Sequence, residues 1–181
     1  SSKMFVPVVS IDNQPLMPTK PSRARRWIKE GKATPFWKQG IFCVRLNVEP
    51  ETRNTQTVAC GIDPGSKKEA FTVKSKASTY LNIQADSVDW VSDAVKTRRE
   101  MRRGRRFRNT PCRKPRFNRS RGGIPPSTKA RWQWKLRLCW WLSGIFPITD
   151  WVVEDVAATT KKGKRKCLVG LTPTRNVLSN Q

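Results

Sequence analysis

Histidine is absent from the sequence, and acidic residues are few. The 181 residues include 37 Lys and Arg but only 13 Asp and Glu, which gives a formal net charge of +24 at pH 7. The absence of histidine excludes Ser-His-Asp and Cys-His catalysis, histidine-ligated zinc and HNH-type nuclease chemistry. Any chemistry must therefore use carboxylates, lysines or a bound metal. The charge imbalance predicts a polyanionic partner, and nucleic acid is the leading candidate.

Long apolar runs and paired cysteines are also missing. No stretch of 18 or more apolar residues and no basic amphipathic helix with an apolar sector occurs, so we expect a soluble protein with no membrane partner. The apolar run near the N-terminus is too short for a signal peptide. The five cysteines, Cys43, Cys60, Cys112, Cys139 and Cys167, show no CxxC spacing. This pattern predicts reduced thiols in a cytosolic compartment and argues against a zinc knuckle.

Residues 4–54 read as a small β–α–β unit. The apolar "FVPVVS" predicts a strand, "PLMPTKPSRARRWIKEGKA" a short helix, and "GIFCVRLNV" a second strand. Thr19 or Ser22 can cap this helix, and Gly31 ends it. A basic helix face is often simply solvated, but the charge of the whole chain favours contact with phosphate. The residues expected to make that contact are Lys20, Arg23, Arg25 and Arg26.

Residues 55–86 predict two or three strands. In "TVACGIDPGSKKEAFTVKS" a strand leads into a tight turn at Asp63-Pro64-Gly65, and another strand follows. Asp, Pro and Gly are the usual residues of a plain hairpin turn, which is one interpretation of this segment. The other is that a buried strand ending in a carboxylate presents a metal ligand at a sheet edge, as many nucleases do.

Residues 87–123 begin as a helix with one apolar stripe and continue as a helix with none. Val88, Val91 and Val95 recur at helical spacing near the start. Beyond Lys96 arginines occupy every side of the helix, and like charges at i and i+4 weaken it unless an anion surrounds it. Arginine outnumbers lysine eleven to two between Lys96 and Gly123, which favours bidentate phosphate contacts. The helical residues expected to bind nucleic acid are Arg98, Arg99, Arg102, Arg103, Arg105, Arg106 and Arg108.

The segment after Asn109 is broken by prolines and two glycines, which predicts an extended arm that orders on binding. Phe107 and Phe117 can stack on unpaired bases, or they can pack into the protein. The arm residues expected to bind nucleic acid are Arg113, Lys114, Arg116, Arg119 and Arg121.

Residues 124–160 predict a helix followed by a buried strand. Ser127 or Thr128 can cap the helix, and its tryptophans and leucines fall on two faces, so we expect both faces to be buried. The strand "DWVVEDVAA" ends at Glu154 and Asp155, which point to opposite faces because they are adjacent. Residues 161–181 read as a basic linker and tail.

Together these segments resemble the IscB and IsrB proteins, a family of transposon-encoded RNA-guided nucleases. The resemblance covers about residues 4–160 and rests on "PLMP", "GIDPGSK", "RREMRRGRR" and "WVVED" in this order. It implies a PLMP domain at 4–54, RuvC segments at 55–86 and 124–160, and an arginine-rich bridge helix with a basic arm at 87–123. The implied fold class is α/β: a small β–α–β unit plus an incomplete RuvC or RNase H-like mixed sheet that the bridge helix interrupts.

The resemblance also implies a metal site and its partners. Asp63 and Glu154 match the family's first two catalytic carboxylates, which hold Mg²⁺ for phosphodiester cleavage. The family's third carboxylate segment is not in this sequence, since residues 160–181 contain no acid, and no HNH insertion is present. We therefore expect guide-RNA binding and an incomplete metal site, with Mg²⁺ bound only if that site is completed. The implied partners are a structured guide RNA, target DNA and possibly a second chain that completes the fold.

Two other functions remain open at this stage. The chain could be a non-catalytic RNA-binding component of a larger ribonucleoprotein, such as a ribosome, that has kept the arginine helix and lost its catalytic set. It could also be a general basic DNA-compacting protein, which would bind with a steep salt dependence and no preference for structured RNA. The expected location is the cytoplasm, at the nucleoid when DNA is bound, or an organelle of bacterial origin.

Overall fold

The computed structural model describes residues 4–65, 67–111, 114 and 124–154. These residues form two compact units. The first holds the residues up to Asp86 together with Leu136–Glu154, and the second holds Ser87–Lys135. Both sheets of the first unit mix parallel and antiparallel strands, so the predicted α/β class is confirmed. No helix in the described part of the chain is both long enough and apolar enough to span a membrane.

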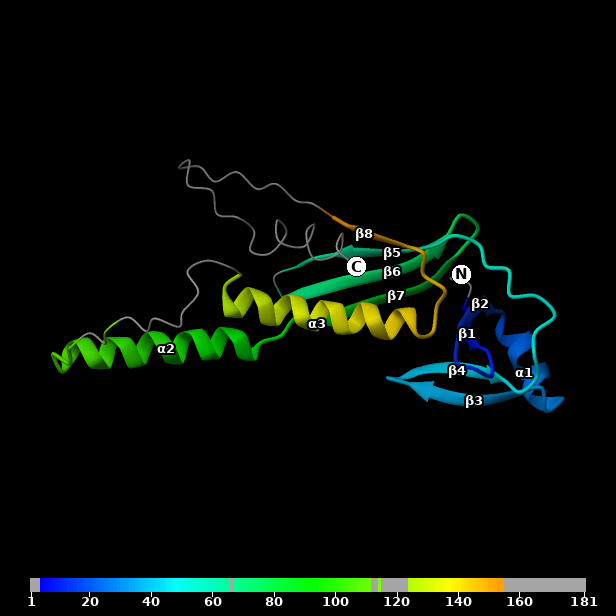
Figure 1. Cartoon of the computed structure of the whole chain (residues 1–181), viewed down its shortest axis with the longest axis horizontal. Coiled ribbons are helices and arrows are strands. Elements are labelled where there is room, and N and C mark those ends of the chain that lie inside the picture. Colours follow the sequence, from blue (N-terminus) through cyan, green and yellow to red (C-terminus); the bar gives the residue numbers. More distant parts are fainter. Residues whose placement is uncertain (1–3, 66, 112–113, 115–123, 155–181) are drawn as a thin grey trace. The chain divides into compact units, whose positions relative to one another are not determined.

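The N-terminal sheet has the strand order β2-β1-β4-β3 (Figure 1). Its elements are β1 (Val6–Val9), β2 (Pro15–Thr19), α1 (Pro21–Lys29), β3 (Ala33–Lys38) and β4 (Ile41–Leu46). β1 runs parallel to β4, while β2 and β3 are antiparallel to their neighbours. The predicted β–α–β unit is therefore present, with two extra strands around it. Its small core packs Val8, Ala24 and Val44 together.

Helix α1 begins differently from the prediction. Its N-cap is Lys20, which makes no side-chain capping bond, so neither Thr19 nor Ser22 caps the helix. Thr19 is instead the last residue of β2 and is buried, whereas Ser22 already lies inside the helix. The start is fixed by Pro21 at the first helical position, where a missing N–H costs nothing. Gly31, at φ +70°, follows the C-cap as predicted.

The second sheet has the strand order β7-β6-β5-β8 (Figure 1). Its strands are β5 (Val58–Asp63), β6 (Lys68–Ser75), β7 (Thr79–Asp86) and β8 (Asp150–Val153). β6 runs antiparallel to both β5 and β7, and β8 runs parallel to β5. One face carries alternating apolar residues such as Cys60, Ile62 and Phe71, and the C-terminal part of α3 (Pro126–Ser143) packs on it through Cys139 and Leu142.

The connection between β5 and β6 is longer than the tight turn that Asp63-Pro64-Gly65 predicted, because the last paired residues are Asp63 and Ala70. β5 and β6 pair without a break up to Asp63, which lies opposite Ala70. A Cβ atom added at Gly65 would overlap the backbone carbonyl of Lys68. Glycine is therefore required there to keep the hairpin closed and to leave Asp63 at the very end of its strand.

Two expectations about residues 124–160 are wrong in detail. The buried positions of α3 form one stripe rather than two faces, and Trp140 is 78% exposed. β8 is an edge strand rather than a buried one, and its Val152 is 58% exposed. The exposure of β8 follows from the strand order, since among the described strands β5 is its only neighbour.

The described cysteines are buried free thiols. Cys43, Cys60 and Cys139 form no disulfide. Burial raises the pKa of the Cys43 thiol to about 11 and that of the Cys60 thiol to about 12. A protonated, inaccessible thiol is a poor nucleophile, so these two residues act as small apolar core groups. The prediction of reduced thiols is confirmed for these three positions, whereas Cys112 and Cys167 lie outside the described residues.

Candidate nucleic-acid interface and carboxylate pair

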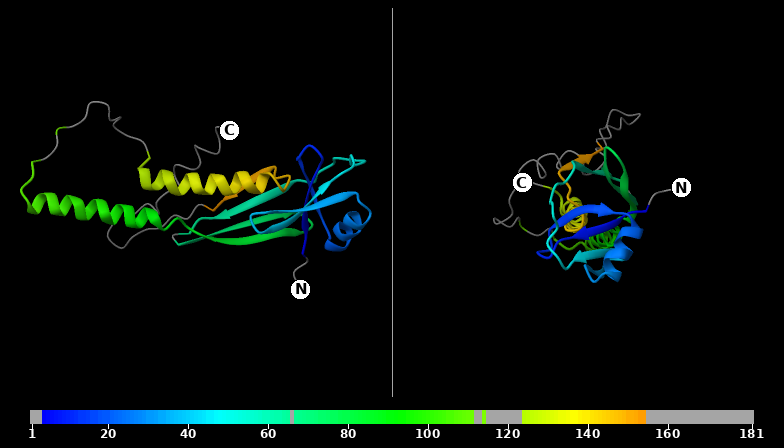
Figure 2. Two further views of the ribbon diagram at one scale, coloured as in Figure 1. Left: turned by 90° about the horizontal axis from the view of Figure 1, so that it is seen from below. Right: turned by 90° about the vertical axis from the view of Figure 1, so that its right-hand side faces the viewer.

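Helix α2 (Trp90–Phe107) forms the centre of the candidate interface. It is one continuous helix (Figure 2) that begins at Trp90, so Val88 precedes it and does not belong to its apolar stripe. The Asp89 side chain accepts a hydrogen bond of 2.7 Å from the backbone N–H of Trp90. Val91 is buried, but Val95 is already 38% exposed. The expected stripe therefore shrinks to the first turn, and the rest of the helix has no buried side.

The predicted arginines of α2 lie on its exposed part. Met101 and Phe107, the only other large apolar residues beyond Lys96, are 65% and 90% exposed. Apolar residues exposed to this extent on both sides of the Arg102–Arg106 run show that the run does not pack on the described residues of its own unit. The exposed arginines are Arg98, Arg99, Arg102, Arg103, Arg106 and Arg108, and Arg105 is half-buried.

These guanidinium groups are almost free of partners in the described part of the chain. Among the described residues, no ion pair involves α2. The one hydrogen bond that an α2 arginine side chain donates to a described residue joins Nη2 of Arg105 to the carbonyl oxygen of Pro111, at 3.1 Å. Arginines at i and i+4, such as Arg98 and Arg102, repel one another. The helix thus presents unneutralised forks that match the geometry of phosphate.

Of the predicted nucleic-acid-binding residues of the basic arm, the structure describes only Lys114. Lys114 is described and exposed. Arg113, Arg116, Arg119 and Arg121 lie outside the described residues, as does Phe117.

The basic residues of α1 are also exposed, but they have a protein surface behind them. Ala24 is 1% exposed and packs into the core of the N-terminal sheet, so the helix has an inner side. Arg26 lies 3.9 Å from Glu30, whose pKa is lowered chiefly by the hydrogen bond from Lys32. The exposed cations of this helix are Lys20, Arg23, Arg25 and Arg26.

Asp63 and Glu154 are brought together by the register of two parallel strands. Ile62 of β5 lies opposite Val153 of β8, and the backbone N–H of Glu154 donates to the carbonyl of Ile62 at 3.1 Å. The next positions in register are Asp63 and Glu154. Their backbones lie about 5 Å apart, which is the usual spacing between neighbouring strands. Because side chains alternate, both point to the face opposite the Ile62 side, and both are exposed. Asp63 and Glu154 are 91 positions apart in the sequence, so only the resemblance could predict this pairing.

Two carboxylates do not complete a magnesium site. Among the described residues no group of three or more His, Cys, Asp and Glu could hold a metal ion. Phosphodiester cleavage by two metals uses more oxygen ligands than one Asp and one Glu provide. One Asp and one Glu are therefore too few ligands for such a site among the described residues, and Asp155 lies outside them.

The sequence did not predict one set of ion pairs in the N-terminal unit, which joins Arg53 to Asp12 and Glu49. Arg53 donates from its Nη atoms to Asp12 at 3.1 and 3.2 Å and from Nε to Glu49 at 2.8 Å. The hydrogen bond from Arg53, with a second from Ser10, lowers the pKa of Asp12 to about 2. Asp12 and Arg53 are 41 positions apart in the sequence, so no local pattern predicts their contact. The one indication was that a rare acid in a turn of this basic chain should pair with a cation.

Comparison with known families gives one match. The model of a family described as "RRXRR protein" matches residues 6–172. The pattern in that name, two arginines, any residue and two arginines, occurs in α2 as Arg102-Arg103-Gly104-Arg105-Arg106. No curated protein matches the chain.

Proposed function

The chain belongs to the RRXRR protein family, and we propose that it is a guide-RNA-binding protein of the IscB and IsrB type. The observation that carries the proposal is α2, a helix whose arginines beyond Val95 are exposed except for the half-buried Arg105 and form no ion pair with any described carboxylate. Such a helix is stabilised when anions surround it, which a folded RNA does better than a single flat surface. In this proposal base pairing by the RNA selects the DNA target, and the protein reads backbone shape.

The carboxylate pair supports a nuclease ancestry. Asp63 and Glu154 share one edge and one face of a mixed sheet, which is where a RuvC-like enzyme needs its first two ligands. We propose them as two of the ligands of a Mg²⁺ site that a further segment or a second chain completes. The metal, when bound, would stabilise the charge of the phosphodiester under attack. The described residues themselves hold two oxygen donors side by side at the end of a rigid parallel pair.

A non-catalytic role in a larger ribonucleoprotein is the second candidate. It is favoured by the same incomplete donor set, because a protein that only binds RNA needs no third ligand. Trp140, exposed on α3, and Val152, exposed on the edge strand, would suit a chain that is covered by other components.

The test begins with the nucleic acid that copurifies with the full chain. Sequencing should return one discrete structured RNA, and supplying that RNA with a matched DNA target should give Mg²⁺-dependent nicking once the site is completed. Asp63→Asn and Glu154→Gln should abolish nicking and leave RNA affinity unchanged, with Asp86→Asn as an exposed control on the same sheet. Ribosomal RNA in place of a discrete guide would establish the second candidate. Recovery of no RNA, or equal nicking by all variants, would contradict the guide-RNA proposal.

A further inference from the structure

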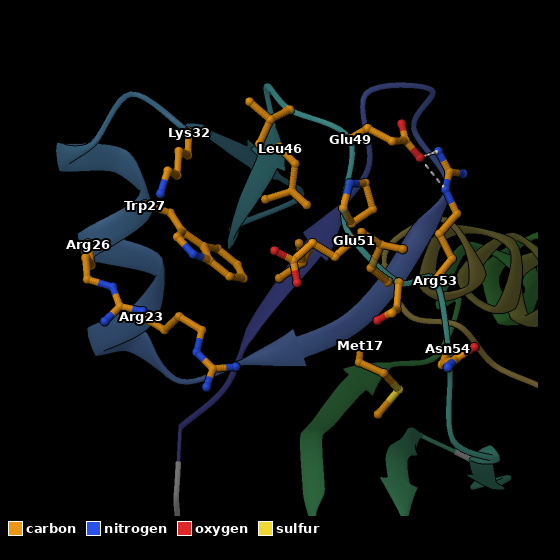
Figure 3. Close-up of a pocket in the computed structure, with 15 residues that line it drawn as sticks. Met17, Arg23, Arg26, Trp27, Lys32, Leu46, Glu49, Glu51, Arg53 and Asn54 are labelled. Atoms are coloured by element: carbon orange, nitrogen blue, oxygen red, sulfur yellow. Dashed lines mark hydrogen bonds and ion pairs between the residues drawn. The ribbon is translucent and has the colours of Figure 1, made fainter.

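A cleft of about 650 Å³ opens between α1 and the segment that follows β4 (Figure 3). Its volume falls within the range of small-molecule sites, about 300–1,000 Å³. One side is formed by α1 with Arg23, Arg26 and Trp27. The other side is formed by residues 48–54, and Met17 and Leu46 contribute apolar surface from the sheet. All of these residues belong to the first unit.

The wall opposite α1 is held in place by Arg53. Its guanidinium bridges Asp12, in the turn before β2, and Glu49, in the wall itself. These contacts pair Arg53 with two carboxylates and connect the segment around Glu51 to the turn before β2. All three side chains are at least 40% exposed, so the contacts orient this wall of the cleft but add little to stability.

Inside the cleft the free groups differ in kind. Trp27 is half-buried, with part of its ring packed on the core of the N-terminal sheet. Arg23 and Glu51 have no ion pair or side-chain hydrogen bond with any described residue. Figure 3 shows Glu51 reaching from its wall toward Trp27, while Arg23 extends from α1. A flat aromatic ring, an unpaired cation and an unpaired anion thus share one hollow.

We propose that this cleft binds a single unpaired nucleotide of RNA, guanosine in preference to uridine. The base stacks on Trp27, the phosphate contacts Arg23, and the edge of the base donates hydrogen bonds to Glu51. This inference rests on the proposed RNA binding and deepens it, because it assigns one nucleotide of the bound RNA to a specific hollow.

The mixed charge of the cleft argues for a base rather than a run of phosphates. A carboxylate beside a phosphate backbone is repulsive, so Glu51 would oppose a simple polyanion. It is favourable when it accepts from N–H groups, and it can accept two at once. Guanine presents two parallel N–H donors on its Watson–Crick edge, whereas uracil presents one flanked by carbonyl oxygens. A base stacked on an aromatic ring is worth about 1–3 kcal/mol, or roughly 5- to 150-fold in Kd.

The experiment follows the indole N–H signal of Trp27 in NMR spectra of the full chain. Guanosine monophosphate, uridine monophosphate and inorganic phosphate are titrated separately, at a salt concentration that suppresses loose phosphate contacts. The signal is assigned with Trp27→Phe. Trp37, 70% exposed on β3 and outside the cleft, is the internal control. Guanosine monophosphate should shift Trp27 and not Trp37, with a Kd about tenfold below that of uridine monophosphate.

Three variants at exposed positions keep the test independent of folding. Glu51→Gln should reduce the preference for guanosine to about twofold or less, and Asp86→Asn should leave it unchanged. Arg23→Gln should weaken both nucleotides by a similar factor. An equal shift of Trp27 by inorganic phosphate would reduce the site to a simple anion site and overturn the proposal, as would no shift by either nucleotide.

RNA binding by the same preparations separates this inference from the proposed function. If the copurified RNA binds tightly through the α2 arginines while no nucleotide moves Trp27, the cleft proposal fails and the guide-RNA proposal stands. If a peptide-like carboxylate ligand such as acetyl-aspartate shifts Trp27 more than guanosine monophosphate does, the cleft serves an acidic protein partner, and the nucleotide assignment is wrong.

Discussion

Helices α1 and α2 are both strongly basic, but they differ in how much of each helix is buried against the protein. α1 has an inner side, where Ala24 is 1% exposed and packs on a sheet. In α2 only Val91 is buried. Further along the helix even the apolar residues Met101 and Phe107 are exposed to solvent. The basic residues of α1 lie on a helix that is also packed against the sheet. Most of α2, in contrast, consists of exposed residues, and many of these are basic.

The difference separates two sources of helix stability. In proteins most helical stability comes from packing an apolar face, and α1 has that contribution. α2 has an Asp89 side-chain bond at its start and arginine repulsion along its length, so we expect a bound anion to stabilise it. A bound RNA would therefore order α2 as well as be held by it, while the same RNA would find α1 already formed.

The largest expected effect comes from removing charge on the helix without an inner side. Replacing Arg98, Arg99, Arg102 and Arg103 by Ala should weaken structured-RNA binding about 100-fold or more and lower the salt slope by about four units. Replacing Arg23, Arg25 and Arg26 of α1 by Ala should have a smaller effect on both quantities. Filter binding over a range of salt concentrations measures both. The four arginines changed to Lys serve as the control, because charge is kept and bidentate contact is lost. An unchanged slope in the Ala variant would rule out α2 as the main RNA contact.

A smaller effect is expected from enlarging the inner side of α1. Ala24→Leu should lower the free energy of unfolding by about 1–3 kcal/mol, because the side chain has no room in a packed core. Thr97→Leu introduces the same residue at an exposed position of α2 and should change stability by no more than about 0.5 kcal/mol. Urea unfolding measures both. Equal effects at the two positions would mean that α1 is not held by its packing.

The smallest effects should come from two glycines and should have opposite signs. Gly104→Ala should favour α2 by about 0.5–1 kcal/mol, since the added Cβ meets only the Arg108 side chain, at 3.7 Å. Gly31→Ala should cost a similar amount, because φ is +70° just after α1. Circular dichroism should show more helix in the first variant, and thermal unfolding should show a lower Tm in the second. A destabilising Gly104→Ala would indicate that α2 must bend there.

Much of the local structure could be predicted from the residues alone. Alternating apolar residues in 55–86 indicated the strands that became β5, β6 and β7, and Pro21 with Gly31 bounded α1. The arginine run was correctly read as a helix with no inner side beyond its first turns. What could not be predicted was the number of neighbours each element finds. The apolar residues of α3 predicted two apolar faces and those of β8 a buried strand, but the buried residues of α3 form one stripe and β8 is an edge strand.

The candidate sites divide in the same way. Composition by itself predicted a polyanionic partner and excluded histidine chemistry, since charge and residue type do not depend on folding. The turn at Gly65 and the exposure of the α2 arginines also follow from local residue patterns. Only the tertiary structure decided that Asp63 and Glu154 are neighbours and that Arg53 props a cleft open beside Trp27. The physical reason is that strand register and long-range ion pairs join residues far apart in the chain, and no local pattern records which partner each one meets.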